Sequence, residues 1–257
     1  MENQSQQPVQ QPNPVNPPAP PVGAPRPQPD AAQIANDVAA MAGNYVSSMN
    51  TGLLPVVESI KQAITIGVKN AASLIVASIL YVLTIWIPYL NVGTTIAMLS
   101  IPIELSKGNV ISPTFIFKSV YRKYMGQFFL LSALMTIGIL MGIAFVILPA
   151  VVLSYSWCIA IYLLFDKKVN AIQALIKSNE FTYGYKMKIF CIKFLFGIVF
   201  MLAYLLIMGV ATALDNDFGA ILAVILTLVI VVVQLAATMG LDAVIYRELL
   251  KRKDVTI

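Results

Sequence analysis

The chain has 257 residues, of which 58% are apolar and only 11% are charged, and its mean hydropathy is +0.80. Soluble domains are about half apolar and a quarter charged, so this composition excludes an ordinary soluble protein and predicts membrane-spanning helices. The net charge is +5 and histidine is absent, which removes the commonest general base and the commonest ligand of zinc, copper and haem iron.

The N-terminal region predicts a solvated tail followed by one short helix. Residues 1–29 are rich in Gln, Asn and Pro, so we expect a disordered cytoplasmic tail, with a PxxP docking site for a partner as the alternative. They lack the basic start and apolar run of a cleaved signal, so the first span is expected to act as an uncleaved signal-anchor. Residues 30–50 predict an amphipathic helix that packs on the membrane surface or on a partner. Its apolar residues recur at helical spacing: Ile34, Val38, Met41 and Tyr45.

Residues 51–250 predict a membrane domain of six spans, which leaves 251–257 as a basic C-terminal tail. The spans are 71–87, 92–105, 128–148, 150–165, 189–213 and 218–241. The second and fourth are short for a hydrocarbon core of about 30 Å at about 1.5 Å per residue, so a re-entrant segment is the alternative for either. Pro102 also predicts a break in the second span.

The distribution of basic residues predicts the orientation. All of them except Arg26 fall within 61–69, 107–123, 167–193 and 247–253, whereas the connections near Pro88, Pro149 and Asp215 carry none. By the positive-inside rule the four basic regions share the cytoplasmic face, and six crossings achieve this. We therefore expect a multi-pass protein of a bacterial inner (cytoplasmic) membrane with both termini in the cytoplasm.

Each predicted pair of spans follows an amphipathic segment, and the three segments resemble one another. Their lysines, at positions 61, 118 and 177, are 57 and 59 residues apart, and their glycines, at positions 67, 126 and 184, are 59 and 58 apart. The spacing favours an internal repeat of an interfacial helix and a membrane hairpin. Any protein that alternates hairpins with basic loops could also show it. The predicted fold class is all-α, a polytopic helical membrane protein with six transmembrane helices as three hairpins, each preceded by an interfacial amphipathic helix.

The sequence contains no phosphate loop, catalytic carboxylate pair, metal cluster or nucleophile elbow, so we expect neither an enzyme nor a cofactor. Gly138 and Gly142 form a GxxxG step in the third span. In membrane helices this step favours close helix packing, which we expect to lie within the monomer because five other spans compete for that face.

Three carboxylates are predicted to form an acid–base collar. Glu104, Asp166 and Asp242 each lie at the cytoplasmic end of a returning span, where a negative charge opposes the helix macrodipole and calls for a partner. The predicted partners are on the amphipathic segments or one turn away along the last span: Lys61, Lys118, Lys177 and Arg247. The alternative is that these acids are fully solvated.

The segment from Asn170 to Phe196 carries the most recognisable pattern, in which AIQA at 171–174 precedes Lys177-Ser178 and Tyr183-Gly184. With Tyr246 to Leu249, it resembles a broad group of bacterial six-helix membrane proteins that includes the membrane domain found beside glycerophosphodiester phosphodiesterases. The resemblance covers about 52–250 through short, degenerate motifs. It implies a helical membrane domain, and it carries over no activity, because the catalytic phosphodiesterase domain has no counterpart in this chain.

These observations favour a non-catalytic inner-membrane protein that organises lipids or partner proteins at the cytoplasmic leaflet. Interfacial Lys and Arg attract anionic headgroups by about 1 kcal/mol per charge. The same charges could instead only set the topology. A transporter or channel for a small solute or lipid is the alternative function, favoured by the repeat and by Pro102, although no span carries a central charge. As binding partners we expect membrane lipids and also a protein, but no nucleic acid.

Overall fold

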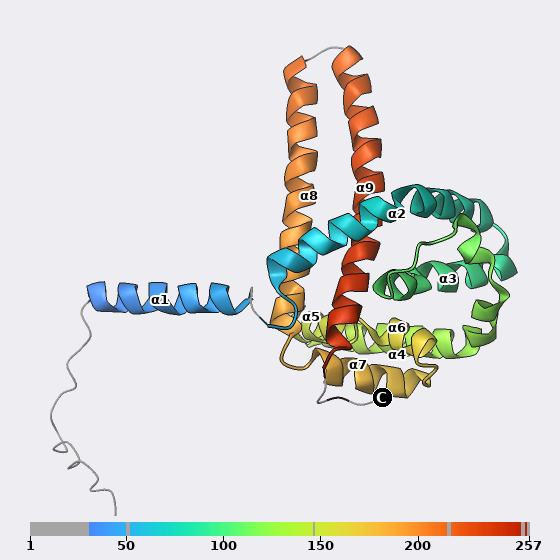
Figure 1. The fold of residues 1–257 in the computed structure, drawn as a ribbon, viewed down its shortest axis with the longest axis horizontal. Coiled ribbons are helices and arrows are strands. Elements are labelled where there is room, and N and C mark those ends of the chain that lie inside the picture. The colour runs from blue at the N-terminus through green and yellow to red at the C-terminus, as the bar shows by residue number, and fades with distance from the viewer. Residues whose placement is uncertain (1–30, 50–51, 146, 215–216, 253–254, 256–257) are drawn as a thin grey trace, which may run out of the picture. The chain divides into compact units, whose positions relative to one another are not determined.

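The computed structural model describes residues 31–49, 52–145, 147–214, 217–252 and 255, and the chain divides into two compact units, Met1–Gly43 and Asn44–Ile257. Every regular element in these residues is helical, in agreement with the predicted all-α class. Figure 1 shows their order. The elements are α1 (Ala31–Met49), α2 (Val56–Thr84), α3 (Pro88–Ser106), the 3₁₀ helices η1 (Pro113–Phe117) and η2 (Ser119–Tyr124), α4 (Met125–Ala144), α5 (Ile147–Ser156), α6 (Ala160–Asp166), α7 (Ala171–Thr182), α8 (Lys186–Leu214) and α9 (Asp217–Leu249).

The predicted N-terminal helix is present as α1, and the exposed side chains of Val38 and Met41 lie on it. The predicted tail 1–29 lies outside the described residues. So do positions 253, 254, 256 and 257 of the predicted C-terminal tail.

Among the described residues, five helical segments are long and apolar enough to cross a bilayer, which makes the chain a multi-pass membrane protein. They are Val56–Thr84, Ser119–Ala144, Ile147–Asp166, Lys186–Leu214 and Phe218–Leu249. The predicted second span, now α3, is not among them, mainly because Asn91, Glu104 and two prolines lower its mean hydropathy. Thr94 and Thr95 bond across to α2, where Thr94 Oγ1 lies 3.1 Å from Thr84 Oγ1 and Thr95 Oγ1 lies 3.2 Å from the Tyr81 hydroxyl. Six crossings therefore stay a prediction.

Several element boundaries differ from the prediction. Helix α3 continues through Pro102, so the expected break there is wrong. The fourth span is instead divided, because the helix stops after Ser156 as α5 and resumes at Ala160 as α6. The last helix continues past the predicted end of its span to Leu249. Asp242 and Arg247 therefore lie on the same continuous helix as the apolar residues of the span.

The three amphipathic segments do not share one structure. The first is continuous with the first span in α2, since no Pro interrupts the run from Val56 to Thr84. The second forms the 3₁₀ helices η1 and η2 in place of an α-helix. Only the third is a separate α-helix, α7, and the Asn170 side chain caps it by accepting from the Gln173 N–H at 2.8 Å.

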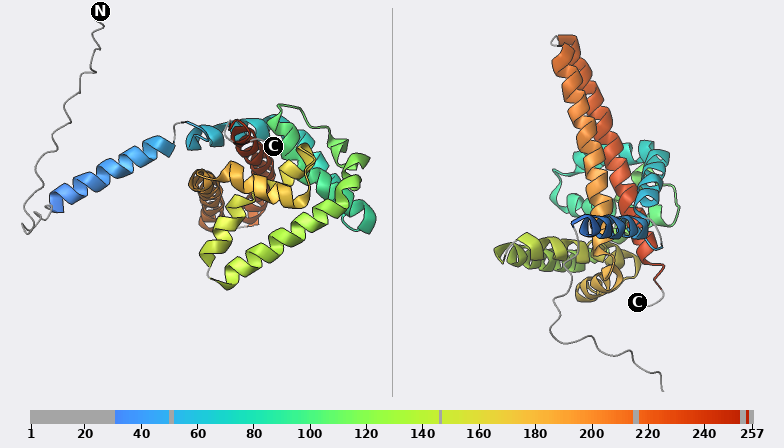
Figure 2. Two further views of the ribbon diagram at one scale, coloured as in Figure 1. Left: turned by 90° about the horizontal axis from the view of Figure 1, so that it is seen from below. Right: turned by 90° about the vertical axis from the view of Figure 1, so that its left-hand side faces the viewer.

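Neighbouring helices pair along the chain, but the pairs are not parallel to one another. Helices α8 and α9 run antiparallel as a long hairpin, joined by the Tyr204 hydroxyl, which donates to Gln234 Oε1 at 2.8 Å. Helix α4 packs beside α5 and lies across the α8–α9 axis in Figures 1 and 2. Helix α2 also crosses α9. A bilayer whose normal follows α8 and α9 would contain α4 nearly in its plane.

Small residues allow α2 and α9 to cross at close range. A Cβ atom on Gly67 would lie 2.7 Å from the Ala236 carbonyl oxygen, and one on Gly240 would lie 2.2 Å from the Ala63 carbonyl oxygen. Each helix thus contributes two small residues one turn apart, the spacing that permits close backbone approach between membrane helices. This crossing fixes the first helix of the membrane domain against the last.

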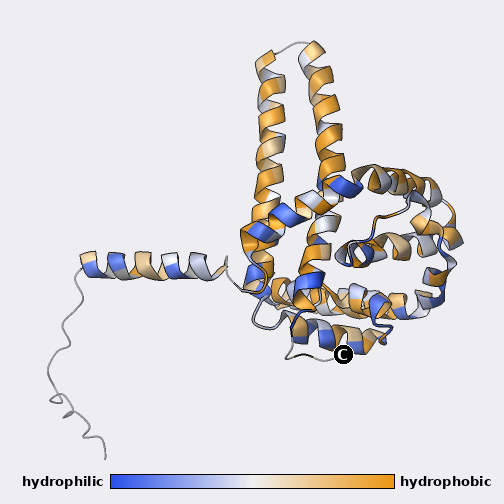
Figure 3. Ribbon diagram, in the orientation of Figure 1, coloured by the Kyte–Doolittle hydropathy of each residue, from blue (hydrophilic) through white to orange (hydrophobic). Residues whose placement is uncertain are grey.

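Apolar and charged residues separate along the helix pairs (Figure 3). The turn at 85–89, the residues Phe145 and Ile147 and the far end of α8–α9 are strongly exposed and apolar, with Trp86 86%, Phe145 77% and Phe218 68% exposed. We call these three ends the tips. The opposite ends carry Lys107, Asp166, Lys193, Asp242 and Arg247, and we call this region the base. Large apolar side chains that are exposed together in this way are typical of contact with lipid or with another protein.

Candidate functional site

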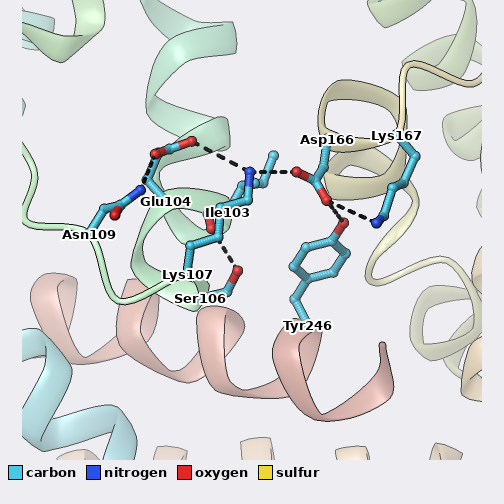
Figure 4. A network of polar contacts seen from close by, with 8 residues as sticks. All are labelled: Ile103, Glu104, Ser106, Lys107, Asn109, Asp166, Lys167 and Tyr246. Carbon is cyan, nitrogen blue, oxygen red and sulfur yellow. Dashed lines mark hydrogen bonds and ion pairs between the residues drawn. The ribbon is translucent and has the colours of Figure 1, made fainter. Parts of the chain in front are cut away.

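The base contains an ion-pair network that joins three helices (Figure 4). The Lys107 ammonium group, just beyond α3, lies 2.6 Å from Asp166 Oδ1 at the end of α6 and 3.8 Å from Glu104 Oε1. The Tyr246 hydroxyl of α9 donates to Asp166 Oδ2 at 2.8 Å, and Lys167 Nζ lies 3.8 Å from the same oxygen. Asp166 is therefore the centre of the network, held by groups from α3, α6 and α9.

Burial makes this network sensitive to the loss of a partner. The Asp166 side chain is only 9% exposed, whereas the Lys107 side chain is 47% exposed. Burial by itself would lower the pKa of Lys107, but the carboxylates of Asp166 and Glu104 outweigh it, so the pKa is raised above its usual value. Lys107 thus remains a cation throughout the physiological pH range.

A second ion pair fixes the hairpin of α8 and α9 at the base. Lys193 Nζ lies 3.0 Å from Asp242 Oδ1, and both side chains are partly buried. Next to it the buried ring of Tyr162 packs against the ring of Tyr246, with centroids 5.5 Å apart. This aromatic contact connects the second ion pair to the Asp166 network through the packed core.

Two arginines attach the end of α9 to neighbouring helices. Arg247 donates from Nη2 to the Gln62 side chain of α2, and its Nε lies 3.5 Å from Glu248 Oε1. Arg252 donates from Nη1 to the carbonyl oxygens of Glu180, Phe181 and Tyr183, at 2.9, 2.9 and 2.8 Å. These carbonyls close the C-terminal turn of α7, where a cation also opposes the negative end of the helix dipole.

The three acids of the predicted collar lie at the base, but their partners differ from those predicted. Among the described residues, the ion-pair partners of Glu104, Asp166 and Asp242 are Lys107, Lys167 and Lys193. Lys177 instead pairs with Glu180 at 2.9 Å, and Lys118 stacks over the Phe115 ring at 4.5 Å. Lys61 lines a pocket with Glu58, Gln62 and Arg247.

One sequence signal could have identified Lys107 as a partner of Glu104. Lys107 follows Glu104 by three residues, a spacing that brings two side chains together on a helix. No local pattern links Lys107 to Asp166 or Lys193 to Asp242, because each of these pairs depends on the packing of separate helices.

The GxxxG step of α4 packs against the neighbouring segment of the same chain. A Cβ atom on Gly138 would lie 2.5 Å from the Trp157 ring, and one on Gly142 would lie 2.8 Å from the Ala150 backbone nitrogen. Both glycines therefore allow α4 to approach α5 and the turn after it, and the Trp157 ring lies against Gly138.

Two pockets with mainly apolar walls adjoin the N-terminal end of α8. The larger has a volume of about 500 Å³, and the smaller about 240 Å³. Val152 and Lys186 line both of them. The remaining lining residues of the larger pocket are Leu134, Leu153, Ser156, Trp157, Ile172, Leu175, Ile176 and Asn179, and those of the smaller are Leu148, Val151, Tyr155, Met187 and Phe190.

Basic and aromatic residues also share another pocket of about 240 Å³, lined by Lys118, Val120, Tyr121, Tyr124, Phe165 and Lys168. In the described part of the chain, no group of three or more His, Cys, Asp or Glu side chains is placed to hold a metal ion.

No protein-family model matches the chain, and no curated protein sequence or solved structure matches it either. The role of the base is therefore inferred from its own residues.

Proposed function

We propose that this chain is a non-catalytic membrane protein whose base holds anionic lipids, and through them or directly a partner protein, at one leaflet. The separation of exposed apolar tips from a charged base carries this proposal. The apolar helices that lead to the tips favour hydrocarbon, while lysines and arginines at the opposite ends favour the headgroup region, where anionic lipid attracts them by about 1 kcal/mol per charge.

The aromatic residues of the base support the same assignment. Tyr121, Tyr124 and Phe165 line a pocket together with Lys118 and Lys168. Tyrosines and lysines are enriched at the level of lipid headgroups, because their apolar bodies and polar ends suit a boundary between oil and water.

The proposed topology keeps the six predicted crossings, with the base and both termini on the cytoplasmic side of a bacterial inner membrane. The α8–α9 hairpin is the strongest candidate for a pair of crossings. Helix α8 has 29 residues, and at about 1.5 Å per residue it is longer than a hydrocarbon core of about 30 Å. A crossing by α4 requires it to tilt toward α8 and α9 relative to Figure 2.

A reconstitution experiment tests the proposed function. The full chain is placed in vesicles of equal parts phosphatidylcholine and phosphatidylglycerol with matched acyl chains, extracted in mild detergent, and its copurified lipid is quantified by mass spectrometry. We expect enrichment of phosphatidylglycerol over the bulk ratio, decreasing as salt is raised because exposed charges are screened. Copurified lipid with the bulk composition would contradict the proposal.

A further inference from the structure

The region around Lys186 combines one cation with the two pockets described above. Lys186 is the first residue of α8, and its Nζ donates a hydrogen bond to Asn179 Oδ1 of α7 at 2.9 Å. An ammonium group has three N–H donors, so this bond leaves donors for an anion. The positive end of the α8 macrodipole lies at the same place and adds to the attraction.

The two pockets have walls that suit hydrocarbon. The apolar residues Ile172, Leu175 and Ile176 of α7 line the larger pocket, and Ile172 and Ile176 are 58% and 52% exposed. Trp157, seated against Gly138, lines the same pocket. The smaller pocket is lined by Leu148, Val151, Met187 and Phe190 among others. The described residues that line the two pockets include no acid, so nothing in the lining opposes a negative charge.

The shared residues define how the pockets relate to the lysine. Val152 of α5 and Lys186 line both, so the two cavities adjoin at these two residues. Their volumes of about 500 and 240 Å³ together lie within the range of about 300–1,000 Å³ that is usual for ligand pockets. A single cationic residue that lines two adjoining apolar cavities is complementary to a molecule with one anionic head and two apolar tails.

We propose that one diacyl anionic phospholipid binds here, with its phosphate at the Lys186 ammonium group and one acyl chain in each pocket. This rests on the proposed function, since the lipid reaches the pockets only if the base lies at the headgroup level. Asn179 positions the lysine, and Val152 separates the two chains.

Tryptophan fluorescence provides a direct readout. The chain has two tryptophans, Trp86 at a tip and Trp157 in the larger pocket. In a Trp86→Phe background, phosphatidylglycerol with brominated acyl chains, added to the delipidated full chain in detergent, should quench Trp157. Brominated phosphatidylcholine should quench it more weakly, and inorganic phosphate should not compete.

Three variants test the two parts of the site. Lys186→Gln should weaken quenching by phosphatidylglycerol about fivefold, the equivalent of one interfacial charge. Lys123→Gln, the same charge change at an exposed lysine of η2, should stay within about twofold of the parent. Val152→Phe adds bulk at the side chain that the two cavities share, which is 50% exposed, and it should abolish the advantage of the diacyl lipid over its single-chain form.

The outcomes separate this inference from the proposed function. Equal binding by Lys186→Gln and its parent, equal binding of the diacyl and single-chain lipids, or competition by inorganic phosphate would each overturn the site while leaving general enrichment of anionic lipid intact. Absence of that enrichment in the copurified lipid would instead overturn the proposed function. If Lys186→Gln did not fold, the lipid comparisons on the parent and Val152→Phe would still decide the question.

Discussion

At the scale of single residues, Asp166 shows why the base cannot be treated as a set of solvated surface charges. Its side chain is 9% exposed, and Lys107 and Tyr246 both contact it. A buried carboxylate that loses its cation retains the desolvation cost without the compensating attraction, and breaking a fully buried pair typically costs about 3–5 kcal/mol. Since Lys107 is about half exposed, solvent screens part of this interaction and the expected cost is smaller.

Replacing Lys107 tests this network. We expect Lys107→Met to destabilise the protein by about 1–2 kcal/mol, measured by thermal or denaturant unfolding in detergent. Lys123→Met, which removes the same charge from an exposed position, should change the stability by less than about 0.5 kcal/mol. The double variant Lys107→Met with Asp166→Asn should lose less than the sum of the two single losses. Strict additivity would show that the pair is not coupled.

The pH dependence of the Lys107 contribution follows from its raised pKa. A cation whose pKa is higher in the folded than in the unfolded state stabilises the protein fully below the unfolded pKa of about 10.4, and this contribution is lost as the pH rises through the folded pKa. The stability difference between the parent and Lys107→Met should therefore be constant between about pH 7 and 9 and decrease above about pH 10.5. A decrease that begins near neutral pH would contradict the raised pKa.

At the scale of elements, glycines with different surroundings provide matched controls for helix packing. Gly67 and Gly240 lie where α2 and α9 cross, and an added Cβ atom would meet backbone at 2.7 and 2.2 Å. Gly197 and Gly209 lie within α8 with nothing within 4 Å of an added Cβ. Close approach of backbones, rather than helix propensity, is therefore what distinguishes the first pair from the second.

Alanine substitution should separate these two classes. Gly67→Ala and Gly240→Ala should each destabilise the protein by about 3 kcal/mol, because the neighbouring helix must move away. Gly197→Ala and Gly209→Ala should be neutral or stabilising by up to about 1 kcal/mol, since alanine is the better helix former. Thermal unfolding of all four variants in one detergent provides the comparison. Equal effects at the four positions would rule out a tight crossing of α2 and α9.

Helix α7 depends on a residue that lies 69 to 72 positions away in the sequence, because Arg252 donates to the carbonyls at its C-terminal end. We expect Arg252→Gln to raise hydrogen exchange of the amides in α7, as the loss of a terminal cation and its bonds costs about 1 kcal/mol. Exchange in α4 should be unchanged, which makes that helix an internal reference. Unaltered exchange in α7 would mean that α7 holds its position without Arg252.

At the scale of the whole molecule, the direction of the helix pairs in the bilayer can be measured by cysteine labelling. In a background of Cys158→Ala and Cys191→Ala, single cysteines are introduced at Asn91, Asn109, Lys168 and Ala213. Six crossings predict that positions 91 and 213 react from the outer side and that positions 109 and 168 react from the inner side. Reaction of position 91 from the same side as 109 would instead show that α2 and α3 lie in the plane of the membrane.

The sequence alone was sufficient for features that depend on local composition and periodicity. Apolar runs predicted a helical membrane protein, since a helix satisfies its own backbone hydrogen bonds wherever it lies. The start of α7 is local in the same sense, because its cap joins Asn170 and Gln173, which are only three positions apart. The positions of Glu104, Asp166 and Asp242 at the ends of returning spans likewise predicted that the three carboxylates lie on the same side of the molecule.

Only the tertiary structure decided which groups meet on that side. Lys107 reaches Asp166 because α3 and α6 pack together, and Lys193 reaches Asp242 because α8 folds back on α9. Neither distance follows from periodicity, which describes one helix at a time and contains no information on the angle between two helices. The pockets at Lys186 depend on the same angles, since residues of α4, α5, α7 and α8 line them.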